Sequence, residues 1–158
     1  MSIIEESGIL AISTRLQRIS EQLRKEAGLL YKAFDIDFES KWFPVIYTLH
    51  HKELLSVVEI ANEIGYTHPS TISLLKELEK HRLIRSKKDK EDERKRLIQL
   101  TAKGKELVLQ MQPVWEIMIV VLNDITGNPN NMLKAITEFE EKIANQSFLQ
   151  RALEQKNK

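Results

Sequence analysis

Seven basic residues lie within twelve positions of this chain, between Arg85 and Arg96, around a short acidic stretch. Lysine and arginine side chains bind phosphate oxygens, and arginine presents a rigid fork of donors for that purpose. Apolar pairs flank the basic run at Leu83-Ile84 and Leu97-Ile98. That pattern is typical of a hairpin whose base packs on a core and whose tip projects outward. The sequence therefore predicts a basic hairpin that contacts a polyanion.

The charge of the chain is unevenly distributed. Overall it has 24 basic and 23 acidic residues, a net charge of +1. Residues 67–105 contain 12 basic and 6 acidic residues, so this segment carries +6 and the remainder −5. A phosphate backbone senses such a local excess, which the whole-chain charge hides. The alternative is a solvated charged hairpin without a ligand, because charge runs are often only exposed faces.

Two short helices are expected immediately before the hairpin. Ser56 and Glu59 form a capping-box pattern at the start of one helix, and Gly65 is suited to its end. The next helix begins around His68-Pro69 after a very short junction, which makes a helix-turn-helix. Apolar residues of the second helix share one face and are expected in the core: Ile72, Leu75 and Leu78. Polar residues lie on or beside the opposite face: Ser70, Ser73, Lys76, Glu77 and Lys80.

Longer helices are expected at both ends of the chain. Apolar residues recur every three or four positions from Ile9 to Phe34, and another helix is expected near Ser40. After the hairpin, Thr101 is a good N-cap for a helix that Pro113 should kink or interrupt. The terminal helices carry more apolar surface than a monomer can cover. We therefore expect a two-fold dimer. The second helix of each helix-turn-helix, the recognition helix, should then lie near 34 Å from its counterpart, which is the spacing of successive major grooves of DNA.

With these elements placed, the chain resembles the MarR (multiple-antibiotic-resistance regulator) family. The resemblance rests on LLKELEKHRLI, on the Asp92-Glu93-Arg94 tip, and on LIQLTAKGKEL. It implies a mainly α fold with a small β-wing, a winged helix-turn-helix whose N- and C-terminal helices form a dimerisation layer. It implies a sequence-specific DNA-binding transcription regulator, a ligand-responsive repressor acting as a homodimer on an inverted repeat. The expected organisation is a single domain over residues 1–158, with dimerisation helices at 5–33 and 130–156, the winged helix-turn-helix at 38–104 and a connecting helix at 102–125.

One position departs from the family pattern. Family members often have glycine where this chain has Arg82, at the end of the recognition helix. If the backbone there is left-handed, arginine costs about 1 kcal/mol.

The resemblance and the residue types together define candidate DNA contacts. Arg94 at the wing tip is suited to a narrow minor groove, where negative potential is enhanced, and Asp92 is expected to hold its guanidinium. The alternative for this pair is a solvated surface ion pair of under about 1 kcal/mol. Short hydroxyl side chains on the recognition helix discriminate bases modestly. The predicted DNA-binding residues are His68, Ser70, Thr71, Ser73, Lys76, Lys87, Lys88, Asp92, Arg94 and Arg96.

Other functions are less well supported by the sequence. Cysteine is absent and no catalytic constellation is evident, so we expect neither an enzyme nor a cofactor. His50, His51 and Glu53 do not match a closed zinc site, since adjacent histidines point in different directions on a helix. A small-molecule effector of unknown identity is expected near Trp42, Tyr47 and Trp115. An acidic N-terminus without a signal peptide and the lack of a long apolar stretch predict a cytoplasmic protein without a membrane partner. The alternative function is a winged-helix protein-interaction or regulatory module without DNA binding.

Overall fold

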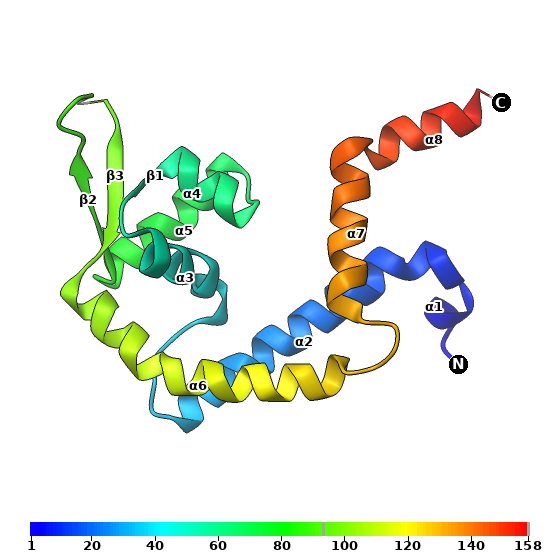
Figure 1. Ribbon diagram of the computed structural model, residues 1–158, viewed down its shortest axis with the longest axis horizontal. Helices are drawn as coiled ribbons and strands as arrows, with labels where there is room; N and C mark the ends of the chain where they lie inside the picture. Colours follow the sequence, from blue (N-terminus) through cyan, green and yellow to red (C-terminus); the bar gives the residue numbers. More distant parts are fainter. Residues whose placement is uncertain (93, 158) are drawn as a thin grey trace. The chain divides into compact units, whose positions relative to one another are not determined.

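The computed structural model describes residues 1–92 and 94–157. It is mainly helical with one three-stranded antiparallel sheet, which confirms the predicted fold class (Figure 1). The chain divides into two compact units, Met1–Val114 and Trp115–Lys158. Glu93, part of the predicted hairpin tip, lies outside the described residues. The single-domain organisation stays a prediction.

The first unit begins with a broken helical segment instead of one long helix. A short helix α1 (Ile3–Glu6) is followed by the 3-10 turn η1 (Gly8–Ala11) and then by α2 (Ile12–Ala33). Gly8 has a φ of +58°, which is outside the helical range and separates α1 from the elements that follow. The long helix therefore starts at Ile12, three residues later than the apolar repeat suggested.

The helix-turn-helix follows the predicted boundaries closely. The 3-10 turn η2 (Ser40–Trp42) leads into α3 (Phe43–Lys52). The strand β1 (Leu55–Ser56) precedes α4 (Val57–Ile64), where both bonds of the Ser56–Glu59 capping box are present. Gly65 ends α4 in the left-handed region, and α5 (His68–Lys80) begins after Thr67, whose hydroxyl accepts from the Ser70 amide. The hypothesis of a helix-turn-helix is confirmed in its geometry.

The hairpin forms a wing on this core. Strands β2 (Ile84–Lys88) and β3 (Arg96–Leu100) pair antiparallel, and β1 adds to the other side of β3. Ile84, Ile98 and Leu100 are buried, whereas the basic side chains of β2 are mostly exposed. The apolar pairs therefore fix the base of the wing, defined here as residues 84–100, and the charged part projects from it (Figure 1).

Helix α6 (Ala102–Thr126) starts at a close contact with the wing base. The Thr101 hydroxyl accepts from the Gly104 amide and donates to the Arg82 carbonyl. A Cβ at Gly104 would collide with the Leu83 carbonyl, so only glycine fits without a shift. The helix continues through Pro113, which does not interrupt it. By length and composition α6 also qualifies as a candidate membrane span, so the expectation that no stretch is long and apolar enough was wrong.

The second unit contains the end of α6, helix α7 (Met132–Asn145) and helix α8 (Phe148–Lys156). Ser147 and Gln150 form a capping box at the start of α8, as the sequence suggested. Neither α7 nor α8 buries a residue. Their large apolar side chains are instead exposed, at Leu133, Ile136, Phe139, Ile143, Phe148, Leu149 and Leu153.

Candidate nucleic-acid interface

The recognition helix α5 presents a short polar surface at its N-terminal half. Ser70 and Ser73 are exposed, and His68 is exposed at the first helical position. Lys76, one turn further on, is also exposed. The Thr67 hydroxyl donates to Ser70 Oγ at 2.9 Å, which leaves the serine oxygen able to donate outward. Four predicted contact residues are therefore brought onto one accessible helix.

Thr71 is a correction to the predicted interface. Its side chain is 0% exposed, and its hydroxyl donates to the Thr67 carbonyl at 3.0 Å. The buried face of α5 includes Leu74, Leu75 and Leu78, whereas Ile72 is only half-buried. The prediction of Leu75 and Leu78 as core residues is confirmed, but the buried face also includes Thr71 and Leu74. Thr71 cannot reach a base edge from there.

Glu77 links α5 to the residues before α3. Its Oε1 accepts from the Trp42 indole Nε1 at 3.0 Å and lies 2.8 Å from Lys41 Nζ. Lys41 Nζ also lies 3.0 Å from Glu39 Oε2. The hydrogen bond from Lys41 is the main cause that lowers the pKa of Glu77, and the bond to Glu77 raises the pKa of Lys41. The recognition helix thus carries an ionised carboxylate whose bonds are made within the protein.

The end of α5 is a Schellman turn. The Leu83 amide donates to the Leu78 carbonyl at 3.1 Å, and the Arg82 amide donates to the Glu79 carbonyl at 2.9 Å. Arg82 has a φ of +59°, the left-handed conformation in which glycine is favoured. Leu78 and Leu83 are both buried, which supplies the apolar contact that accompanies this motif. The condition stated for Arg82 is therefore met: an arginine occupies a position whose backbone favours glycine.

The wing exposes most of the predicted cations. Lys87, Lys88, Arg94 and Arg96 are all exposed. Arg85, on the same strand β2, faces Gln99 across the ladder, and with the amide oxygen turned toward it the guanidinium donates at 2.5 and 2.7 Å. The Arg85 guanidinium is therefore paired across the strands with Gln99.

Asp92 has a different role from the expected one. Its Oδ1 accepts from the backbone amide of Arg94 at 3.0 Å, and its carbonyl accepts from the Lys95 amide at 2.9 Å. Asp89 makes a similar contact with the Glu91 amide. Asp92 therefore shapes the backbone of the wing tip instead of holding the guanidinium. It remains relevant to the interface because it directs where Arg94 emerges.

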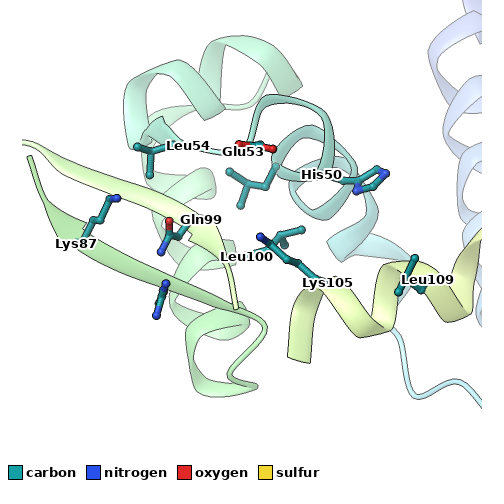
Figure 2. Close-up of a pocket in the computed structure, with 10 residues that line it drawn as sticks. His50, Glu53, Leu54, Lys87, Gln99, Leu100, Lys105 and Leu109 are labelled. Atoms are coloured by element: carbon teal, nitrogen blue, oxygen red, sulfur yellow. The ribbon is translucent and has the colours of Figure 1, made fainter. Parts of the chain in front are cut away.

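A hollow lies on the outer face of the wing sheet, beside the ends of α3 and α6. Its volume is about 510 Å³. Figure 2 shows Lys87 and Gln99 from the strands and Lys105 from α6 around leucine side chains. Three of its lining residues are basic and one is acidic. The full lining is Leu49, His50, Glu53, Leu54, Arg85, Lys87, Gln99, Leu100, Lys105 and Leu109.

The three predicted ligand-binding aromatics are not gathered around one cavity in the first unit. Trp42 is 2% exposed and lines a cavity of about 300 Å³ with His81, Lys103 and other residues of unit one. Tyr47 is partly exposed on α3, with its ring 4.3 Å from that of His51. Trp115 belongs to the second unit.

The segment that contains the helix-turn-helix and most of the wing matches a family model. Residues 34–95 match the MarR family. This segment is therefore similar to the MarR family. The matched segment ends inside the wing. Solved structures, in contrast, match the fold over most of the chain, 85% and 91% of it in two examples. A search of curated proteins finds no match.

Solved MarR-type structures resemble this chain at low sequence identity. The Staphylococcus aureus MepR–DNA complex has a TM-score of 0.69 and 21% identity, covering 85% of this chain and 97% of that one. The repressor CouR bound to a 23-mer DNA duplex has a TM-score of 0.69 and 21% identity, covering 91% and 98%. Bordetella bronchiseptica BpsR, whose DNA binding is described as regulated by 6-hydroxynicotinic acid, has a TM-score of 0.59 and 20% identity. The match covers 82% of this chain and 98% of BpsR. These similarities show the fold.

Sequence reasoning missed two features of this surface. The Trp42–Glu77 bond joins residues 35 positions apart, and no local pattern marks such a pair. The Arg85–Gln99 pair was within reach, because two strands in register place these residues opposite each other. Arg85 follows Ile84 and Gln99 precedes Leu100, and the pairing of Ile84 with Leu100 makes these two polar residues cross-strand neighbours.

Proposed function

We propose that this protein is a MarR-family, sequence-specific regulator that binds duplex DNA through α5 and the wing. The observation that carries the proposal is the pairing of an exposed serine surface on α5 with exposed cations on the adjoining wing. Ser70 and Ser73 are suited to base edges in the major groove, and Arg94 to the minor groove. His68, Lys76, Lys87, Lys88 and Arg96 are suited to phosphates. The DNA-bound states of MepR and CouR support this assignment.

The serines alone give modest sequence discrimination. A hydroxyl both donates and accepts, so it tolerates several bases, unlike the two-point contact of arginine with guanine. We therefore infer that affinity comes mainly from phosphate contacts and that DNA shape contributes to specificity.

The proposed active form is a homodimer on an inverted repeat, built from residues 5–33 and 130–156. The exposed apolar side chains of α7 and α8 support it, since patches of this kind on soluble proteins mark interaction surfaces. Burial against a second copy would also account for the apolar composition of α6 without a membrane. Repression is proposed on the model of CouR, which is described as a transcriptional repressor.

The proposed effector is a small organic anion. The regulation of BpsR by 6-hydroxynicotinic acid supports this class of ligand. In this chain the hollow of Figure 2 offers the matching chemistry, because Arg85, Lys87 and Lys105 surround leucine side chains. Trp42, Tyr47 and Trp115 stay alternative candidates. A ligand acts only if it binds the DNA-competent and incompetent states with different affinity.

The test is duplex binding as a function of salt. Fluorescence anisotropy with DNA upstream of the protein's own coding sequence should show affinity falling by about 10³–10⁵ between 50 and 200 mM salt if six to ten phosphates are contacted. Footprinting should then show an inverted repeat. A protein-interaction module without DNA binding would give no salt-dependent binding at all, and that result would refute the proposal in favour of the alternative.

A further inference from the structure

The recognition helix is tethered through one acidic side chain that lies beside its polar surface. Glu77 follows Ser73 by four residues, so it lies on nearly the same side of α5 as the two serines. Its carboxylate is bound by the Trp42 indole at 3.0 Å and by Lys41 Nζ at 2.8 Å. The orientation of α5 about its own axis therefore depends on a contact made outside the helix-turn-helix.

Trp42 is itself held rigidly. Its ring centroid lies 5.6 Å from that of Phe38 and 4.6 Å from that of His81 at the end of α5. Phe38 in turn packs edge-on against Tyr31 of α2 at 4.9 Å. A continuous series of aromatic contacts thus runs from the end of α2 to the end of the recognition helix. The indole N–H is the only polar group of the Trp42 side chain, and it donates to Glu77.

We propose that Trp42 is a positioning residue that orients the recognition helix on DNA through its hydrogen bond to Glu77. This inference rests on the DNA-binding function proposed above. Serine side chains are short and cannot compensate for a rotated or displaced helix, so base contacts through Ser70 and Ser73 require accurate placement of the backbone. Lysines that bind phosphates have long flexible stems and tolerate the same displacement. Loss of the tether therefore affects sequence discrimination more than total affinity.

Lys41 completes the arrangement. An ionised carboxylate beside the serines would repel the DNA backbone, and the Lys41 ammonium, which also pairs with Glu39, offsets part of that charge. The hydrogen bond from Lys41 is the main cause that lowers the pKa of Glu77, and the Glu77 carboxylate accepts from the indole N–H. Lys41 thus holds the Glu77 carboxylate by an ion pair that it shares with Glu39, and Trp42 directs the carboxylate by a hydrogen bond.

The experiment compares two duplexes. A preferred duplex is first selected from a random pool by the wild-type protein, and its affinity is compared with that of a shuffled duplex at fixed salt. Failure of the wild-type protein to enrich any duplex would refute the proposed function itself. With a preferred duplex in hand, Trp42→Phe keeps an aromatic ring at this buried position and removes the indole N–H donor. We expect its affinity for the preferred duplex to fall about tenfold and that for the shuffled duplex to change less than about twofold.

Two further variants separate positioning from charge. Glu77→Gln keeps an acceptor for the indole and should preserve the ratio between the duplexes, whereas Glu77→Met should lower it as Trp42→Phe does. Glu63→Met is the matched control, because Glu63 is also an exposed carboxylate paired with a lysine, Lys52, on another helix. The proposal is overturned if Trp42→Phe and Glu77→Met leave the ratio of affinities for the two duplexes unchanged, or if they lower both affinities equally. It is also overturned if Glu63→Met lowers the ratio as much as Glu77→Met does. If Trp42→Phe does not fold, the Gln and Met variants of Glu77 decide the question.

Discussion

Replacement of Arg82 by glycine should stabilise the protein. The residue has a φ of +59°, and a left-handed conformation costs an L-residue with a side chain about 1–2 kcal/mol. Glycine removes this cost but gains about 0.5–1 kcal/mol of conformational entropy in the unfolded chain. The expected net gain in the free energy of unfolding is about 0.5–1 kcal/mol.

The hydrogen bonds at this turn survive the substitution. The Arg82 amide donates to the Glu79 carbonyl, and the Arg82 carbonyl accepts from the Thr101 hydroxyl. The third bond, from the Leu83 amide to the Leu78 carbonyl, does not involve Arg82. None of the three bonds uses the Arg82 side chain. The Arg82 side chain is exposed. Nothing in the packing should therefore offset the gain.

The assay is urea unfolding at fixed protein concentration, since association would otherwise shift the midpoint. The midpoint should rise with an unchanged slope, and the melting temperature should rise by about 1–4 °C. Arg82→Ala is the control, because it removes the charge and keeps the Cβ in the strained conformation. A gain in Arg82→Ala equal to that in Arg82→Gly, or no gain in either, would refute the reasoning.

Further outcomes follow from the interface. Arg94→Ala should weaken binding to all duplexes and reduce the salt slope by about one per subunit, and an equal effect of Lys105→Ala would indicate a diffuse basic surface instead of a specific wing contact. Ser73→Ala should change the preference among operator variants by up to about 1–3 kcal/mol at one base pair and leave random DNA unaffected, as competition assays can show. The folded pKa of Glu77 lies below its ordinary value of 4.5, so its contribution is present above that pH and is lost as pH falls through the lowered value. The difference in melting temperature between wild type and Glu77→Gln should accordingly narrow on acidification below about pH 4.5, and a constant difference would contradict this. Analytical ultracentrifugation at micromolar concentration should show a dimer, and a monomer would refute the assembly.

Local signals predicted the centre of the molecule well. The Ser56–Glu59 capping box and the glycine at the end of α4 each depend on residues within a few positions of one another. Such short-range chemistry is legible in a sequence because the backbone geometry between the partners is nearly fixed.

Features set by packing or by side-chain choice were less predictable. Thr71 and Ile72 differ by about 100° around the helix, and only the tertiary contacts decide which of them faces the core. Asp92 had two donors available, the guanidinium and the amide of Arg94, and the tight turn at the wing tip favours the amide. The Trp42–Glu77 bond depends on how η2 packs against α5, which no periodicity encodes.

The order of the strands gives the wing lysines a second consequence, for solubility. Strand β2 is at the edge of the sheet, next to β3 only, so one row of its backbone groups is not paired within the sheet. An edge of this kind is a template for pairing with other chains, and lysine on an edge strand opposes it through repulsion and hydration. Lys87 and Lys88 lie on that edge. Neutralising these two lysines to test their part in DNA binding would therefore also remove a barrier to aggregation.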